Sequence, residues 1–477
     1  MRWLILGLAM VSAGCSGGTR LSTPRLVAIG PVQSELTRDQ QIDHVLSRLA
    51  YGARPGDNEK VKSVGVERWI ALQLTPERID DRVADSAVAT YRTLSTPTGE
   101  LTAIFREVRM ARRDTAKPEP MRDMVMDSRR RLQLSLGEVA AAKLSRAVLS
   151  DRQLYEQMVD FWENHFSVFA GKGQTRLFVP AYDRDVIRPN AMGRFRDLLG
   201  AVAKSPAMLF YLDNAQSAAD STHATLQQIR QRSRRGLNEN YARELMELHT
   251  LGVDGGYSQR DVIEVARALT GWGIDPREGA FVFRPAIHDA DEKVVLGTRF
   301  PAGRGIEDGE QVLDILARHP STARFIVRKL VVRFVSDSAP PALVERCAGA
   351  FTRSEGDIRE TLKCVVTSPE FFSRAAYRAK VKTPFELVAS ALRATNATPD
   401  GTPRSTQLLA RLGQPIFGRQ TPDGWPDQAA EWVNAGAMVN RTNFGLALAA
   451  GRVPGVRVVS VDQTVGALLS TPEFQRR

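Results

Sequence analysis

The chain has 477 residues, 43% of them hydrophobic and 25% charged, a balance typical of a folded globular protein with a sizeable core. The formal net charge of +11 comes from basic residues scattered along the chain, with only short runs such as Arg129 to Arg131. Proteins that bind nucleic acids usually concentrate basic residues in one stripe. We therefore expect no nucleic-acid partner.

Residues 1–14 have the layout of a bacterial lipoprotein signal peptide. Arg2 precedes a short apolar stretch, and residues 12–15, Ser-Ala-Gly-Cys, resemble a lipobox. We expect Cys15 to be lipidated and the lipid to anchor the protein to a membrane. Ser16, in place of Asp, resembles an outer-membrane sorting signal. The expected location is the cell envelope, on the periplasmic face of the outer membrane.

Beyond the signal peptide, the sequence predicts a tether and then one helical domain. Residues 15–38 are rich in Gly, Ser, Thr and Pro, which predicts a flexible tether. Over residues 39–477 apolar residues recur every three or four positions, which predicts a single large multi-helix domain. The charged, Pro-containing stretch 109–131 predicts an exposed excursion between helices. The segments 280–289 and 293–300 predict one small β-hairpin, so the expected fold class is mainly α.

The segment 238–250, NENYARELMELHT, predicts a short amphipathic helix with Asn240, Arg243, Glu244 and Glu247 opposite its apolar stripe. A second helix, opened by a capping box at residues 258–261, returns beside it. The first helix contains no Lys, and the planar fork of Arg243 suits buried pairing with carboxylates. We therefore expect the chain to cover this face and to bury a structural network of Glu239, Asn240, Arg243 and Glu247.

Three histidines are candidates for acid/base chemistry. His165 and His249 each lie within the apolar stripe of a helix, where a histidine is usually a packed core group, and His288 precedes Asp289 in a polar segment. With Glu244 or Asp289 they would form a catalytic set if the fold brought them together. The sequence contains no metal-binding or dinucleotide motif. We expect neither a metal nor a cofactor.

Two residue pairs leave alternatives open. Trp425 and Trp432 either stack on sugar rings at the surface or close one end of a helical core. Cys347 and Cys364 flank a predicted turn of an exported protein, where disulfides can persist. They either form a disulfide across a helical hairpin or remain unpaired core thiols.

The segment 234–272, RRGLNENYARELMELHTLGVDGGYSQRDVIEVARALTGW, closely resembles the signature of the bacterial domain-of-unknown-function family 1800. The resemblance extends from about residue 40 to the C-terminus through the segments HVLSRLAYGARPGD, FWENHFSV, HDADEKVVLG, TARFIVRKLVVRFVSD, TSPEFF, VKTPFELV and GWPDQAAEWVN. It implies an exported, mostly helical protein. It also implies a possible partner from the unknown-function family 1501, which is similar to sulfatases and alkaline phosphatases.

Two functional classes follow from these patterns. The first is an accessory or scaffold protein of the envelope that works with a phosphatase- or sulfatase-like partner, and it requires only a suitable surface patch. The second is an envelope hydrolase acting on a polysaccharide, and it requires a pocket in which the candidate histidines meet Glu244 or Asp289. The absence of standard catalytic motifs favours the first class.

Overall fold

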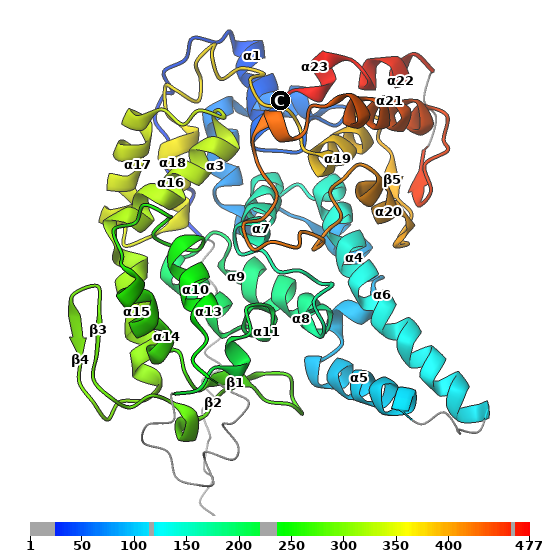
Figure 1. Cartoon of the computed structure of the whole chain (residues 1–477). Coiled ribbons are helices and arrows are strands. Elements are labelled where there is room, and N and C mark those ends of the chain that lie inside the picture. Colours follow the sequence, from blue (N-terminus) through cyan, green and yellow to red (C-terminus); the bar gives the residue numbers. More distant parts are fainter. Residues whose placement is uncertain (1–23, 114–118, 220–235, 459–462) are drawn as a thin grey trace, which may run out of the picture.

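Helices build the body of the molecule, as the spacing of apolar residues predicts (Figure 1). The computed structural model describes residues 24–113, 119–219, 236–458 and 463–477. The helices of the first half are α1 (Arg38–Arg48), α2 (Asp57–Val64), α3 (Val66–Gln73), α4 (Arg82–Val88), α5 (Thr98–Arg113), α6 (Glu119–Leu149), α7 (Gln153–His165), α8 (Thr175–Ala181), α9 (Arg188–Asn190), α10 (Phe195–Lys204) and α11 (Pro206–Tyr211). The mainly α fold class is confirmed.

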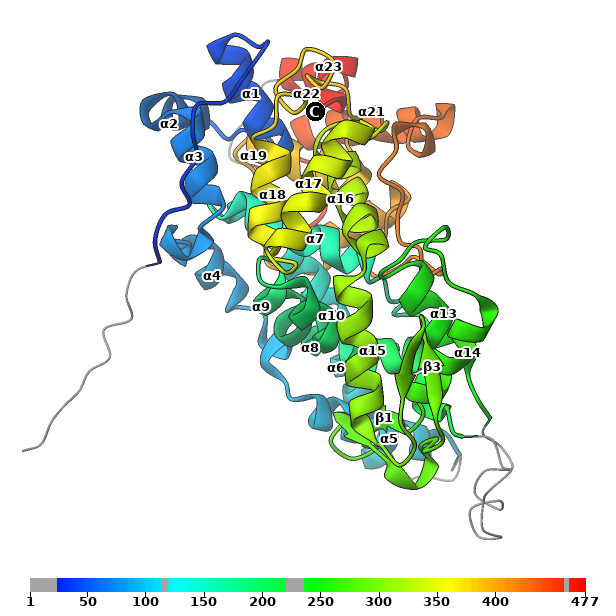
Figure 2. The same cartoon turned by 90° about the vertical axis from the view of Figure 1, so that its left-hand side faces the viewer.

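The second half of the chain is also helical. Its helices are α13 (Glu239–Glu247), α14 (Gln259–Ala268), α15 (Ile306–Arg318), α16 (Pro320–Phe334), α17 (Pro341–Arg353), α18 (Ile358–Val366), α19 (Pro384–Ala394), α20 (Arg404–Arg411), α21 (Ala435–Ala449), α22 (Gln463–Leu469) and α23 (Pro472–Gln475). Helices α16, α17 and α18 lie together in both views (Figures 1 and 2). Among the described helices, none combines the length and the apolar character that a membrane span requires.

The chain before α1 packs along the body. The backbone N–H of Val27 donates to Thr75 Oγ1 at 3.3 Å, and that of Glu35 donates to the carbonyl of Phe372 at 3.1 Å. Leu36 is buried in the main core. The expectation of a flexible tether over 15–38 is therefore wrong from residue 24 onwards. The predicted signal peptide and Cys15 lie outside the described residues.

The stretch 109–131 is not an irregular excursion between helices. Helix α5 runs to Arg113, α6 begins at Glu119, and the two form a hairpin that extends from the body (Figure 1). Pro120 is the second residue of α6, where a proline starts a helix without loss of a hydrogen bond. The proline therefore marks a helix start. The stretch extends from the body with exposed residues as expected, but it is helical and does not interrupt the helices.

The strands form three separate two-stranded sheets in the described part of the chain. Strand β1 (Trp272–Ile274) pairs with β2 (Phe281–Phe283), β3 (Lys293–Val295) with β4 (Thr298–Phe300), and β5 (Thr398–Pro399) with β6 (Val456–Arg457), all antiparallel. The segments 280–289 and 293–300 were expected to pair with each other. Instead β2 pairs with β1, and 293–300 forms its own hairpin because Gly297 takes a positive φ of 77° at the turn.

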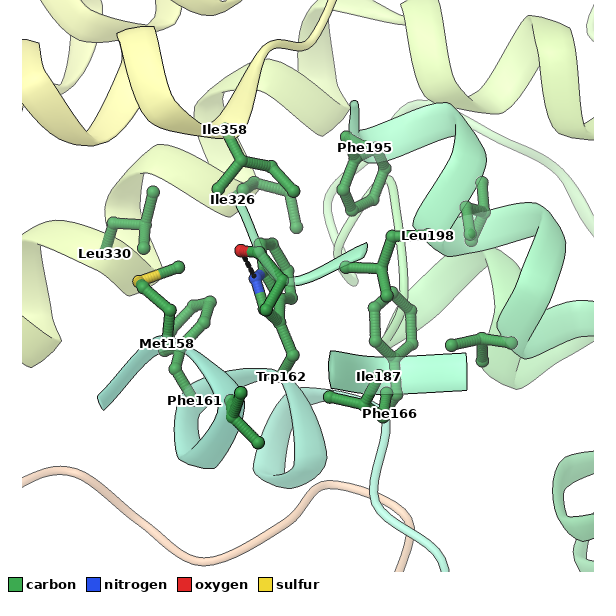
Figure 3. Packing of buried hydrophobic residues seen from close by; sticks show 14 of the residues in the cluster. Met158, Phe161, Trp162, Phe166, Ile187, Phe195, Leu198, Ile326, Leu330 and Ile358 are labelled. Carbon is green, nitrogen blue, oxygen red and sulfur yellow. Dashed lines mark hydrogen bonds between the residues drawn. The ribbon is translucent and has the colours of Figure 1, made fainter. Parts of the chain in front are cut away.

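Helix α7 lies at the centre of the main core. Phe161, Trp162 and Met158 pack against residues of α10, α16 and α18, among them Phe195, Ile326 and Ile358 (Figure 3). The buried indole N–H of Trp162 donates to the carbonyl of Ala191 at 2.9 Å. A second apolar cluster joins the C-terminal part of α6 to α19, α20 and α21. Helix α7 is thus enclosed on most sides, and its polar residues need partners within the protein.

Cys347 of α17 and Cys364 of α18 form a disulfide, with their Cα atoms 5.6 Å apart. Replacing both cysteines with alanine should lower the free energy of unfolding by about 3 kcal/mol, because the cross-link restricts the unfolded chain by closing a loop of this size. Urea unfolding of the variant, compared with the oxidised and the reduced wild type, measures this loss. Equal stability of the oxidised protein and the variant would contradict the expectation.

Candidate functional site

The structure brings two of the candidate histidines together, in an apolar layer. The rings of His165 and His249 lie 6.3 Å apart, and His165 Nε2 lies 3.1 Å from the carbonyl oxygen of His249. Burial lowers the pKa of His249 to about 3 and holds the pKa of His165 well below its ordinary value, and the charge of Lys329 lowers both further. Both rings are therefore neutral at pH 7.

The remaining candidates lie elsewhere. His288 has its own carboxylate neighbour, Asp308, at 3.5 Å, and Asp289 binds the guanidinium of Arg267 at 2.8 and 3.1 Å. Within the described residues, neither His165 nor His249 forms an ion pair with Glu244 or Asp289. The predicted catalytic set is therefore not assembled. The same part of the chain contains no group of three or more His, Cys, Asp or Glu side chains that could hold a metal ion.

The polar face of α13 is partly exposed, so the expectation of a buried network is wrong. The side chains of Arg243 and Glu239 are 40% and 39% exposed and lie 3.5 Å apart, and Asn240 is exposed. Gln259 of α14 accepts from Arg243 at 2.8 Å and donates to Glu239 at 2.7 Å. These contacts link the two helices of the hairpin at its surface. Glu244 and Glu247 are half-buried beside them, and burial raises the pKa of Glu244.

Replacing Arg243 with alanine should lower the free energy of unfolding by less than about 1 kcal/mol, because exposed ion pairs contribute little. Urea unfolding of the variant at low and at high salt measures this effect. A loss of several kcal/mol would show instead that the α13 face is buried in solution.

A buried charge cluster forms on α7 where the sequence pattern had indicated mainly an apolar stripe. Its members are Asp160 and Glu163 of α7, Lys143 of α6, Arg333 of α16 and Glu386 of α19, and we call it the α7 charge cluster. Lys143 Nζ binds Asp160 at 2.7 Å and Glu163 at 2.5 Å. Two carboxylate oxygens that share one ammonium in this way lie within about 5 Å of each other.

Arg333 forms the remaining ion pairs of the cluster. Its guanidinium binds Asp160 at 2.8 Å, Glu386 at 3.2 Å and, in the loop after α20, Asp427 at 3.0 Å. Burial alone would raise the pKa of Asp160, but Lys143 and Arg333 hold it below its ordinary value. Asp160 is therefore ionised at neutral pH.

The pKa of Glu163 is shifted in the opposite direction from that of Asp160. Burial raises its pKa to about 8 against the pull of Lys143, and a hydrogen bond with Asp183 adds to the rise. Glu163 Oε1 is buried and has no hydrogen-bond partner among the described residues. Burial would also raise the pKa of Asp183, but Arg188, 3.0 Å away, holds it low. The environments of the two carboxyl groups thus shift their pKa values in opposite directions.

A small cavity of about 40 Å³ opens on this pair, with Asp160, Glu163, Asn164 and Trp425 among its lining residues. Asn164 donates to the carbonyl of Trp425 at 2.7 Å and accepts from its N–H at 2.6 Å, which fixes the tryptophan loop on α7. Gly424 is required at this contact, because a Cβ there would lie 2.2 Å from the carbonyl oxygen of Asn164. The cavity can hold about one water molecule.

One protein-family model matches nearly the whole chain. The model described as "Protein of unknown function (DUF1800)" matches residues 44–476. The chain belongs to this family. Neither the curated proteins nor the solved structures contain a match to the chain.

Four of the segments that carry the DUF1800 resemblance converge on the α7 charge cluster. FWENHFSV supplies Glu163, TARFIVRKLVVRFVSD supplies Arg333, VKTPFELV supplies Glu386, and GWPDQAAEWVN supplies Asp427 and Trp425. In the DUF1800 chain these segments are separated by as many as 261 residues, the spacing between Asn164 and Trp425. The fold joins them around one cavity.

Sequence reasoning missed the cluster, although α7 carries a signal for it. The helix contains Glu156, Asp160 and Glu163 at intervals of four and three but no Lys or Arg, and large apolar residues occupy many of the other positions. Acidic residues on one face of a helix that is otherwise apolar need cations from other elements. This pattern of acidic residues on α7 was the available indication of a buried charged site in the DUF1800 chain.

Proposed function

We propose that this DUF1800 protein is an envelope hydrolase that cleaves a polysaccharide. The observation that carries the proposal is that Glu163 and Asp160 line one cavity and that their pKa values are shifted in opposite directions, up for Glu163 and down for Asp160. Two carboxyl groups whose environments push their pKa values apart are the arrangement that glycoside hydrolysis uses. Lys143 Nζ binds both carboxyl groups, which keeps them adjacent.

In this proposal Glu163 is the general acid, and the cavity of about 40 Å³ must open to admit the glycosidic bond, because it has room only for water as it stands. The proton of Glu163 passes to the oxygen of the glycosidic bond as the bond to the sugar carbon breaks, and the ionised Asp160 stabilises the positive charge that develops on the sugar. Water then adds to the sugar carbon and returns a proton to Glu163. Lys143 and Arg333 act as positioning residues, because they hold the Asp160 carboxylate in place and ionised.

The test is release of reducing sugar ends from purified envelope polysaccharides by the full-length protein in detergent. Glu163→Gln and Asp160→Asn should each lower the rate by about 100-fold or more, the usual contribution of a general acid or its partner. Glu345→Gln, an exposed carboxylate on α17, is the matched control and should leave the rate unchanged. Inactive wild-type protein, or full activity of Glu163→Gln, would overturn the proposal.

A second function, that of an accessory protein for a phosphatase- or sulfatase-like partner, is favoured by one surface observation. Val439 and Leu446 of α21 are exposed and seven residues apart, so they share one helix face, and Leu468 on the adjoining α22 is also exposed. Exposed apolar groups gathered on one face are typical of protein contacts. Co-purification of a family 1501 partner that Leu446→Lys abolishes would support this function.

We further propose that the protein is a lipoprotein of the cell envelope, anchored at Cys15 on the periplasmic face of the outer membrane. Cys15→Ser should leave the protein unprocessed or release it from the membrane fraction, because the acyl chains supply the membrane affinity. Fractionation of outer and inner membranes, with immunodetection of both forms, measures this. The same distribution and processing of variant and wild type would refute lipidation.

A further inference from the structure

A groove of about 430 Å³ lies beside the cavity of the α7 charge cluster. Its lining includes Arg411 at the end of α20, Trp425 and Arg419 of the following loop, Trp432, and Arg441 of α21. Arg419, Trp425 and Pro426 line both the groove and the cavity. A ligand that follows the groove therefore reaches the wall on which Glu163 and Asp160 lie.

The groove lining is strongly basic. It contains Arg411, Arg419 and Arg441 and a single acidic residue, Glu431. Arg419 is paired with Asp423 at 2.9 Å. Arg411 is exposed at the rim, and no carboxylate of the described residues lies within ion-pair distance of it or of Arg441. The groove thus has the charge that attracts an anion.

Arg441 is the second, independent indication of an anionic ligand. Its side chain is 2% exposed, Nη1 donates to Gln475 at 3.0 Å, and the buried Nη2 has no hydrogen-bond partner among the described residues. Burial lowers the pKa of Arg441 to about 10, so the group remains charged at neutral pH. A buried guanidinium nitrogen without a hydrogen-bond acceptor is unfavourable, and an anion bound in the groove would relieve that cost.

The two tryptophans give the groove an aromatic wall. Their rings lie 6.0 Å apart at 46° to each other, and the Trp432 indole donates to the carbonyl of Pro426 at 2.8 Å, which fixes its orientation. Both tryptophans line the groove; Trp432 is buried at 7% exposure, and Trp425 is half-buried. The C–H face of a sugar ring packs well against the exposed part of an indole such as that of Trp425.

We infer that this groove binds an acidic saccharide, a sugar chain that carries carboxylate groups on its rings. Trp425 contacts the ring faces, and Arg411, Arg419 and Arg441 contact the carboxylates, for which the planar guanidinium is suited. The inference names the substrate class of the proposed hydrolase and rests on that function for the cleavage step alone. Binding itself is independent of catalysis.

The test is calorimetric titration of the full-length protein in detergent with a galacturonic acid hexamer. A neutral glucose hexamer of equal length and inorganic phosphate are the comparison ligands. We expect binding of the acidic hexamer that weakens as salt rises, and at least tenfold weaker binding of the other two. Equal binding of both hexamers, preference for phosphate, or no binding of the acidic hexamer would overturn the inference.

Variants of groove residues distinguish binding in the groove from a general attraction of the basic protein for acidic ligands. Arg411→Gln and Trp425→Leu should each weaken binding by about tenfold, the factor that 1.4 kcal/mol represents. Arg411 is exposed, so its replacement tests the inference even if Arg441→Gln fails to fold. Arg452→Gln, an exposed arginine after α21 that lies outside the groove lining, is the control. Unchanged binding by Arg411→Gln and Trp425→Leu would place the ligand elsewhere.

Separate measurements of binding and of cleavage on the wild-type protein distinguish this inference from the proposed function. If the wild type binds acidic saccharides without cleaving any polysaccharide, the hydrolase proposal fails and the groove assignment stands. If it cleaves only neutral polysaccharides, the groove assignment fails and the hydrolase stands.

Discussion

Replacing Arg333 with methionine should lower the free energy of unfolding by about 3 to 5 kcal/mol, the usual cost of removing one partner from a buried ion pair. Arg333 neutralises Asp160, Glu386 and Asp427 together. Methionine keeps much of the volume of the side chain but leaves these carboxylates with fewer cationic partners. Urea or guanidinium unfolding followed by circular dichroism measures the loss.

The control for this prediction lies on the same helix. Arg324 of α16 pairs with Glu345 at 3.0 Å, but the two side chains are 54% and 60% exposed. Arg324→Met should therefore cost less than about 1 kcal/mol. Equal losses for the two variants would mean that the α7 charge cluster is hydrated in solution rather than buried.

Glu163→Gln should change how the stability of the protein depends on pH. The folded-state pKa of Glu163 is raised from 4.5 to about 8, so between these pH values the folded chain keeps a proton that the unfolded chain loses. Stability then falls as pH rises through this window and levels off above it. The glutamine side chain of the variant does not titrate, and its amide can still donate to Asp183 and accept from Lys143. The variant should therefore lack this fall.

The measurement is a comparison of unfolding midpoints of wild type and Glu163→Gln at pH 5, 6.5 and 8. The variant should gain stability relative to the wild type as pH increases, because other titrating groups contribute equally to both proteins. Parallel pH profiles would show that Glu163 is ionised in the folded state. Glu345→Gln, which lies outside the cluster, should follow the wild-type profile.

The sequence predicted the class of fold and the apolar faces because these depend on local spacing. The stripe through Met158, Phe161 and Trp162 is buried as expected, and the capping box at Ser258 opens α14. The predicted strand pairing was wrong because it left out β1. This strand has only three residues and closely follows α14, so its apolar residues read as a continuation of the helical spacing. Short strands leave little pattern in a sequence.

The candidate site was less predictable because its members come from distant elements. Asp160 has the appearance of a solvent-facing residue when α7 is considered alone, and its partner Arg333 is 173 residues away. Histidines were preferred as candidates because their ordinary pKa lies near neutral pH. Burial changes which groups titrate near neutral pH. It lowers the pKa of His249 to about 3, and it raises the pKa of Glu163 to about 8.

The packing of residues 24–36 against the body limits how far the protein can stand from a membrane. If Cys15 carries the lipid, the stretch between it and Pro24 spans at most roughly 30 Å even when fully extended, at about 3.5 Å per residue. The domain would then work within a layer close to the lipid headgroups. It would act on polymers or proteins attached to that membrane, and material farther across the periplasm would have to come to it.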